Sequence, residues 1–378
     1  KLAVEELHET NRISMTGYRF LHRLFQPFAG TSKKTVPAGV PARLPYPARK
    51  RPSERKPVTR QAGADSSNGP FCWIAIFLAL AVFVPPNPVL AQELKRVSGN
   101  AQIKGAWKEG DITLITTDRL AGAIDSLKWR GTEFIDSADH GRQLQSASNF
   151  DAGSTFVSET FNPTEAGSRF DGAGQKSTSR LIRLKAESNR LESRSRMAFW
   201  LRPGEKSSGH PAKNRQTLSN HYLEKKVVIG YRQFPNVIEY EVVFEIPSGE
   251  NHLYAQFESL TGYMPSIFKD FYCLNLAMRI RKPLSDGPGE QKHPVIFATG
   301  NHDFAMRIYS PQQPSPGYEA AGYGRFRFKN QNVVKWNSVF RIKSKQAIPA
   351  GRYRFLNFVV VGNLDQVTQT MLQLANTR

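Results

Sequence analysis

Three consecutive stretches decide the fold: VIEYEVVFEI (237–246), PSGEN (247–251) and HLYAQFESLT (252–261). Apolar and polar residues alternate in the first and the third, which is the pattern of a β-strand with one buried face. The expected inward faces comprise Ile238, Tyr240, Val242, Phe244 and Ile246 in the first strand and Leu253, Ala255, Phe257 and Ser259 in the second. Because 247–251 has turn composition, we expect the two strands to pair as an antiparallel hairpin.

Short strand patterns recur along the rest of the chain. They cover residues 111–117, 122–135, 181–187, 191–201, 294–299, 303–309, 324–329, 333–342 and 352–361. Turns are expected at Arg130–Gly131 and Ser188–Asn189. A final helix, capped by Asn363 or Asp365, has an apolar stripe of Leu364, Val367, Met371 and Leu374. The predicted fold class is therefore all-β, a large antiparallel β-sandwich with a short C-terminal helix.

The first 91 residues differ in composition from the rest. Residues 1–70 are rich in Arg, Lys, Pro and Ser, which predicts a disordered basic segment. FCWIAIFLALAVFV (71–84) is a run of 14 apolar residues, and Val89–Leu90–Ala91 is typical of a signal-peptide cleavage site. We expect residues 71–91 to act as a signal peptide, with export to the periplasm or the extracellular space. A membrane anchor at 71–84 is the alternative, although the run is shorter than a usual spanning helix.

The remaining residues, 92–378, are expected to form a single domain with a basic surface. They carry 39 Lys and Arg against 27 Asp and Glu, a net charge of +12. Such a surface favours anionic partners. Because no zinc-finger, helix-turn-helix or RNP-like motif is present, nucleic acid is not an expected partner. For an exported protein, acidic polysaccharide is the expected anion, and a membrane contact is expected only through an uncleaved signal segment.

DHGRQLQSASNFDAGSTFVSETFNPTEAGSRFDG (139–172) is rich in charged and amide residues, and we interpret it as a loop-rich functional segment. Arg142 carries the planar fork that binds carboxylates such as those of uronates. Gln145 and Asn149 offer amides for sugar hydroxyls. The alternative for Arg142 is a pairing with Asp136 or Asp139 that holds a loop.

Two further residues of this segment suit acid–base chemistry. A histidine such as His140 changes charge near neutral pH. Glu165 follows Pro163 and precedes Gly167, so its carboxylate is expected on a rigid turn. A purely structural turn residue is the alternative for Glu165. We expect His140, Arg142 and Glu165 to converge on one groove.

The polar face of the strand at 252–261 is the expected floor of that groove, and it comprises His252, Tyr254, Gln256 and Glu258. Sugar sites combine aromatic platforms with hydrogen-bonding groups, and this face has both. An ordinary solvated strand face is the alternative. His302–Asp303 is a single His–Asp pair, which is too little to define a metal site. We therefore expect neither a metal nor a cofactor.

GAIDSLKWRGTEFI (122–135) resembles the opening strands of the galactose mutarotase-like β-supersandwich, where a G-x-I-x-S-L strand precedes G-x-E-F-I. That superfamily includes aldose 1-epimerases and domains of glycoside hydrolases and polysaccharide lyases. The resemblance implies a supersandwich-like fold and a carbohydrate ligand. His221–Tyr222 is similar to the His-x-aromatic element of the epimerases, which implies His221 as a catalytic candidate.

The first functional hypothesis is an exported enzyme that acts on a glycan. A lyase would neutralise a uronate carboxylate with Arg142 and an amide such as Gln145 or Asn149. The C5 proton would then be removed by one of three candidate bases, His140, His221 or Tyr254.

A hydrolase would instead divide the acid and base roles between Glu165 and either Glu258 or Glu239. The second hypothesis is a non-catalytic glycan-binding or cell-envelope protein, because a fold alone does not guarantee chemistry. A sugar epimerase is the third. Absorbance of an unsaturated uronate distinguishes a lyase from a hydrolase.

Overall fold

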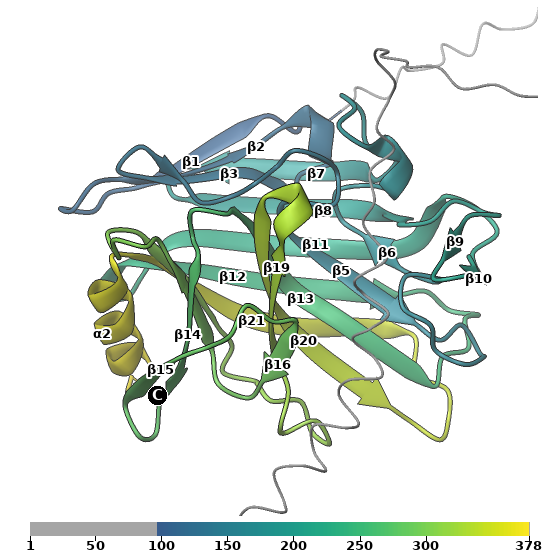
Figure 1. Cartoon of the computed structure of the whole chain (residues 1–378). Helices are drawn as coiled ribbons and strands as arrows, with labels where there is room; N and C mark the ends of the chain where they lie inside the picture. Colours follow the sequence, from purple (N-terminus) through teal and green to yellow (C-terminus); the bar gives the residue numbers. More distant parts are fainter. Residues whose placement is uncertain (1–96, 378) are drawn as a thin grey trace, which may run out of the picture. The chain divides into compact units, whose positions relative to one another are not determined.

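The computed structural model describes residues 97–377, in which alternating apolar and polar residues build a mostly β structure with one α-helix (Figure 1). Hydrogen bonds connect 19 strands, and their pairings are antiparallel. The predicted fold class is thereby confirmed. The expected disordered segment (1–70) and signal segment (71–91) lie outside the described residues. Among residues 97–377, the helix is too short and too polar to cross a membrane.

The strands form two facing sheets. The first runs in the order β7 (Arg180–Glu187), β8 (Arg190–Phe199), β11 (Leu218–Tyr231), β12 (Phe234–Ile246), β21 (Gly351–Gly362), β18 (Ala305–Tyr309), β17 (Val295–Ala298), β14 (Asp270–Asn275) and β15 (Ile280–Pro283). The second runs in the order β1 (Ala101–Gly105), β2 (Ile112–Thr116), β3 (Ile124–Trp129), β5 (Leu144–Phe150), β13 (Tyr254–Pro265), β20 (Val333–Lys343), β19 (Tyr323–Phe328) and β16 (Gly289–Gln291).

Short elements complete the structure. The strand β4 (Thr132–Glu133) pairs with β3 across the predicted Arg130–Gly131 turn, and β6 (Pro163–Thr164) bridges β5 and β8. A separate hairpin is formed by β9 (Lys206–Ser207) and β10 (His210–Pro211). Among residues 97–377, three 3₁₀ turns lie at Asp118–Leu120, Arg169–Asp171 and Lys329–Gln331.

The expected hairpin between the two clearest strands is wrong, although both strands exist. The register places β12 between β11 and β21, and β13 between β5 and β20. The turn at 247–251 therefore carries the chain from one sheet to the other. The inward faces then pack against each other, with the rings of Phe244 and Phe257 5.1 Å apart. Leu253, which was expected to face inward, precedes β13 and is exposed. Alternation defines which face is buried, but it is the same for a hairpin and for an arch between sheets.

Apolar side chains from both sheets form the main core between them. A second core lies on the outer face of the first sheet, under α2 (Leu364–Leu374). The predicted stripe of Leu364, Val367, Met371 and Leu374 is buried there. Asn363 caps the helix, since its side chain accepts a hydrogen bond from Gln366 N at 2.8 Å.

Two strands that position the site were not predicted. The segment 139–172 was expected to be loop-rich, but it contains β5, which lies in the middle of the second sheet. Only Leu144 and Phe150 give β5 an apolar signal, and its small polar residues are satisfied by the neighbouring chain. Ser146 Oγ, for example, donates to Ser259 O at 2.8 Å. The long strand β11 was also missed, because Lys225 and two other polar residues share its buried face.

Candidate functional site

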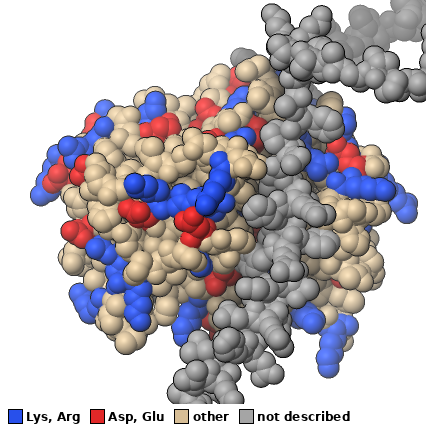
Figure 2. All heavy atoms as spheres, viewed as in Figure 1, with Lys and Arg blue, Asp and Glu red and all other residues tan. Residues whose placement is uncertain are grey.

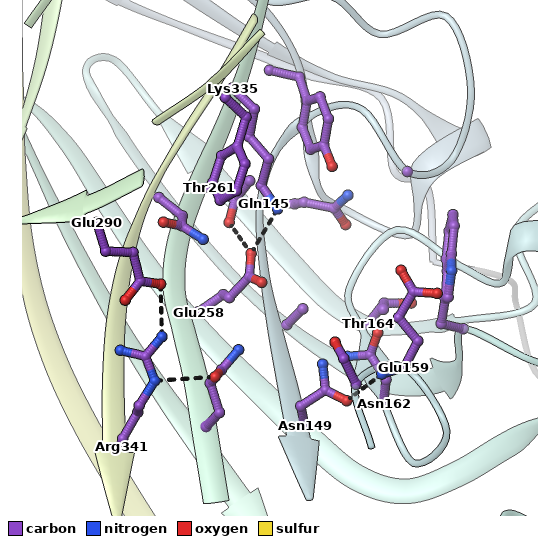
Figure 3. Close-up of a pocket in the computed structure, with 18 of the residues that line it drawn as sticks. Gln145, Asn149, Glu159, Asn162, Thr164, Glu258, Thr261, Glu290, Lys335 and Arg341 are labelled. Atoms are coloured by element: carbon purple, nitrogen blue, oxygen red, sulfur yellow. Dashed lines mark hydrogen bonds and ion pairs between the residues drawn. The ribbon is translucent and has the colours of Figure 1, made fainter. Parts of the chain in front are cut away.

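A pocket of about 380 Å³ lies on the outer face of the second sheet (Figure 3). Its floor is formed by β5, β13 and β20, whose outward side chains include Gln145, Glu258 and Lys335. The loop between β5 and β6 forms one wall and contributes Glu159. The volume falls in the usual range for small-molecule sites.

A β-bulge in β13 arranges the floor. The register of β13 shifts between Glu258 and Leu260 against β20, and between Glu258 and Thr261 against β5. The extra residue, Ser259, allows Glu258 and Thr261 to face the pocket together. Thr261 Oγ1 donates to Glu258 Oε2 at 2.6 Å. Bulges often redirect side chains next to active sites.

Glu258 lies beside a buried lysine. Lys335 Nζ is 3.2 Å from Glu258 Oε2, and the two side chains are 14% and 19% exposed. Burial by itself would raise the pKa of Glu258. The ammonium of Lys335 and the hydrogen bond from Thr261 outweigh that effect and lower the pKa below its usual range. Glu258 is therefore a stable carboxylate in the pocket.

Glu159 has the opposite environment. Its backbone has a φ of 69°, which a non-glycine residue rarely adopts and which occurs often at functional sites. The loop is fixed by Glu159 N, which donates to Asn149 Oδ1 at 3.0 Å, and by Ser207 Oγ, which donates to Glu159 Oε2 at 2.9 Å. Burial raises the pKa of the Glu159 carboxyl despite the hydrogen bond from Ser207. Figure 3 shows Glu159 and Glu258 reaching the pocket from different strands and loops.

A polar cluster occupies another part of the pocket. Arg341 NH2 lies 2.7 Å from Glu290 Oε1, and Arg341 Nε donates to Gln256 Oε1 at 3.2 Å. Tyr254 OH donates to the same Gln256 oxygen at 3.3 Å. Burial raises the pKa of Tyr254 to about 12, although the neighbouring Arg341 acts to lower it. Tyr254 is thus a neutral hydrogen-bond donor near pH 7.

Aromatic rings contribute apolar surface around these polar groups. Trp200, Phe326 and Phe328 line the pocket, and the last two stack with their centroids 6.1 Å apart. Phe156 packs against Tyr254, with the ring centroids 4.4 Å apart. Gly141 lies at the rim, where a Cβ atom would stand 2.8 Å from the Trp200 ring. Aromatic faces beside carboxylates and amides are the usual components of a sugar site.

Five of the predicted site residues line this pocket, namely Gln145, Asn149, Tyr254, Gln256 and Glu258. The two amides also support its wall. Gln145 Oε1 accepts a hydrogen bond from Ala166 N at 3.1 Å, and Asn149 Oδ1 accepts from Glu159 N. Their binding of a ligand remains a prediction.

The expected groove shared by His140, Arg142 and Glu165 is not formed. The ring nitrogens of His140 contact two backbone carbonyls, Gly172 O at 2.7 Å and Arg119 O at 2.9 Å. Glu165 is 1% exposed and pairs with Lys225 at 2.6 Å inside the sandwich. Both side chains therefore have protein partners in place of a ligand, and neither lines the pocket.

Arg142 holds a loop by pairing with Asp139 and Asp136, which was the alternative to a ligand-binding role. Its Nε and NH2 atoms both lie 2.9 Å from Asp139 Oδ2, and NH1 lies 3.7 Å from Asp136. Asp139 Oδ1 accepts from Gly141 N at 2.9 Å, which continues the loop to the pocket rim.

Replacing Arg142 by Lys should therefore lower stability. The ammonium keeps the charge but loses the planar fork, so we expect a loss of about 1 kcal/mol in the free energy of unfolding. Urea denaturation checks this, with Arg183→Lys on the exposed face of β7 as the control that should change nothing. Unchanged stability together with weaker glycan binding would contradict the structural role.

His221 and His252 do not line the pocket either. His252 was expected to share a face with Tyr254, but it precedes β13 and packs inward on Phe150, with ring centroids 4.5 Å apart. His221 faces inward from β11, and both imidazoles contact Glu250. His302, the member of the weak His–Asp pair, contacts Tyr272 OH at 3.0 Å on the surface.

No family model and no curated protein matches the chain. Among solved structures, similar folds include the GH36 alpha-galactosidase AgaB from Geobacillus stearothermophilus, with a TM-score of 0.39 and 12% identity over 73% of this chain and 42% of that one. The heparan sulfate lyase HepC from Pedobacter heparinus has a TM-score of 0.37 and 9% identity over 71% and 36%. The protein Slr1438 from Synechocystis sp. PCC 6803 has a TM-score of 0.36 and 7% identity over 70% and 96%.

This chain thus spans less than half of the length of the alpha-galactosidase. The likeness is distant, and at these TM-scores it carries no argument about the superfamily or the activity of this chain.

Several pocket residues were not predicted. Glu159 lies in SETFN, and nothing in those letters indicates its left-handed backbone or its burial. Lys335 and Arg341 alternate with apolar residues in β20, so they read as ordinary solvated strand positions. A sequence pattern that could have indicated them is the spacing of Lys335 and Arg341, which puts both on one face of a strand. In the structure that strand pairs with β13.

Proposed function

We propose that the pocket binds a sugar unit of a glycan and hydrolyses a glycosidic bond. Glu159 acts as the general acid, and Glu258 acts as the ionised nucleophile or general base. The observation that supports this most is that two glutamates line one pocket in different surroundings. Glu258 is paired with the Lys335 ammonium, whereas Glu159 is buried and accepts from the Ser207 hydroxyl, so that their pKa values are shifted in opposite directions. Environments that separate the pKa values of two carboxyl groups assign their acid and base roles.

The protonated Glu159 would donate its proton to the oxygen of the departing sugar. Glu258, held ionised by Lys335, would either attack the anomeric carbon or activate a water molecule on the opposite face of the ring. The aromatic surfaces of Trp200 and Phe326 are suited to packing against the sugar ring. Gln145 and Gln256, which line the pocket, would contact its hydroxyls.

Uronate cleavage by a lyase is the second candidate, and the arrangement of Tyr254 and Arg341 favours it. Both line the pocket and share the Gln256 oxygen. Arg341 would face the uronate carboxylate, the Glu258 carboxylate would take up the C5 proton, and the neutral Tyr254 hydroxyl would protonate the departing oxygen. Against it, Arg341 is already paired with Glu290, and Lys335 with Glu258. The two cationic side chains of the pocket are therefore already paired with carboxylates of the protein.

The surface charge does not single out an acidic glycan. Figure 2 shows Lys and Arg spread around this face of the described domain, with Asp and Glu among them. On this face the basic residues are thus mixed with acidic ones, and the choice of ligand depends on the contacts in the pocket. Neutral and acidic glycans both belong in the test.

The test is to incubate the purified chain with neutral and uronate-containing oligosaccharides and to measure new reducing ends together with ultraviolet absorbance. Hydrolysis gives reducing ends without the absorbance of an unsaturated uronate. A parallel rise in absorbance would identify the lyase instead. Binding of a glycan by calorimetry, with neither product, would overturn catalysis and favour the non-catalytic glycan-binding protein. The anomer released first tells whether Glu258 attacks directly or through water.

A further inference from the structure

A buried group of two histidines and one carboxylate lies outside the pocket. His221 faces inward from β11, Glu250 belongs to the connection between β12 and β13, and His252 shortly precedes β13. The Nε2 atoms of His221 and His252 lie 2.7 Å and 2.8 Å from the same atom, Glu250 Oε2. One nitrogen or oxygen from each of the three side chains lies within 4.8 Å of the other two.

Aromatic packing fixes the orientation of both imidazoles. The ring of Phe150 lies 4.5 Å from His252 and 5.0 Å from His221, and Phe161 lies 5.4 Å and 6.0 Å from the same two rings. Both histidine side chains are 1% exposed, whereas that of Glu250 is 23% exposed. The two nitrogens are therefore held in a dry, preformed arrangement that opens to solvent on the Glu250 side.

The hydrogen-bonding pattern of His252 is incomplete within the described residues. The Nε2 atoms of both imidazoles are engaged by Glu250. Nδ1 of His252 has no hydrogen bond among residues 97–377, and the Asp151 carboxylate lies 3.7 Å from it, beyond hydrogen-bonding distance. Asp151 is itself fixed, because both its oxygens accept from Leu253 N at 3.1 Å. His252 Nδ1 is therefore a buried polar atom without a partner, in conflict with the rule that such atoms are hydrogen-bonded.

A cation among the three side chains would remove this conflict. The Nε2 lone pairs would bind it, and the proton of His252 would move to Nδ1, facing Asp151. A metal-binding histidine usually directs its second ring nitrogen to a carboxylate in this way. Glu250 and Asp151 also supply two negative charges, while the nearby Lys213 ammonium is bonded to the backbone oxygens of Asp151 and Thr155.

We propose that His221, Glu250 and His252 bind a divalent transition-metal ion of the zinc class, with Asp151 as the carboxylate that orients His252. Two imidazole nitrogens and one carboxylate oxygen form a donor set that zinc prefers, and calcium and magnesium do not. Three protein ligands leave a fourth position, which water can reach past Glu250. The sequence predicted no metal, because Glu250 and His252 form only a Glu-x-His pair and His221 lies 29 residues before Glu250, on β11.

The role of the ion is structural. It links β11 of the first sheet to the start of β13 in the second, and through Asp151 to the end of β5. Asn149 and Tyr254, at the adjoining ends of β5 and β13, line the pocket. The inference does not depend on the proposed glycan chemistry, because it needs only metal binding.

The experiment is to treat the purified, untagged full chain with a chelator, remove the chelator, and titrate ZnCl₂ by calorimetry. We expect one zinc ion per chain and, at about 100 times the dissociation constant, a rise of about 5 °C in melting temperature. Co²⁺ in place of zinc should give the visible absorption of a four-coordinate site. Absence of saturable binding, or zinc binding without any rise in melting temperature, would overturn the proposal.

Variants locate the site. Glu250→Gln keeps the shape but removes the anionic ligand, and it should abolish the zinc response. Asp151→Asn should retain binding but weaken it about 10- to 100-fold. His302→Asn, which removes an imidazole that is 45% exposed, is the control and should bind zinc as the parent does. Should Glu250→Gln fail to fold, Asp151→Asn still decides, and an unchanged zinc affinity in that variant would assign the zinc to another place.

Discussion

Replacing Lys225 by Met should lower the free energy of unfolding by about 3–5 kcal/mol. Lys225 Nζ lies 2.6 Å from Glu165 Oε1 and 2.5 Å from Gly122 O, and both side chains of the pair are at most 1% exposed. Removal of the ammonium leaves the Glu165 carboxylate buried, with one hydrogen bond from Ser146 N at 3.0 Å. Breaking a buried ion pair by removing one partner has a cost of this size.

The measurement is urea denaturation of the parent and the variant at pH 7. Lys185→Met is the matched control, because Lys185 pairs with Glu187 on the surface, where both side chains are 65% exposed. That change should have little effect. The double replacement Lys225→Met with Glu165→Leu should recover most of the loss, since an apolar pair of similar volume often matches a buried ion pair.

The double variant also decides what Glu165 does. Recovery of stability by removing both charges supports a structural pair inside the sandwich. If the double variant is as unstable as the single one, the loss comes from packing and the electrostatic explanation is wrong. If Lys225→Met is as stable as the parent, the Glu165 carboxyl is not held as a buried ion.

The strands could be predicted from the sequence because burial of one face imposes alternation locally. Val237 to Ile246 shows this, and its alternation is the same in the structure. The partner of that strand could not be predicted, because alternation does not distinguish a hairpin from an arch to the facing sheet. β5 was hidden because Ser146 and Ser148 are buried in it as small polar residues whose positions depend on tertiary contacts.

The candidate site was predictable only where it lies on one strand. Tyr254, Gln256 and Glu258 share the outward face of β13, so their alternation was enough to group them. Glu159 lines the same pocket as Glu258 only because the β5–β6 loop forms one of its walls, and the conformation of Glu159 is set by Asn149 and Ser207. The prediction that His252 lies in the site was wrong. It extended the alternation of β13 to His252, which precedes the strand and faces inward.

Replacing Glu159 by Gln should lower kcat for glycan hydrolysis by about 100- to 10,000-fold. The amide keeps the shape and can accept the Ser207 hydrogen bond, but it has no acidic proton to give to the departing sugar. Glu258→Gln should cause a loss at least as large, because the ionised carboxylate is removed. Glu241→Gln, on β12 and paired with Arg354, is the control and should keep full activity.

The pH dependence separates the two glutamates. Glu258 must be ionised, and its pKa lies below the ordinary 4.5, so activity should fall at low pH as Glu258 takes up a proton. Glu159 must be protonated, and its pKa lies above 4.5, so activity should fall as pH rises through that value. The parent should therefore show a bell-shaped profile of kcat/KM, and Glu159→Gln should lose its alkaline side. If the Glu159→Gln variant keeps both sides of the bell, another group is the acid. With Tyr254 as the acid, the alkaline side of the profile would lie at a much higher pH, because the pKa of Tyr254 is about 12.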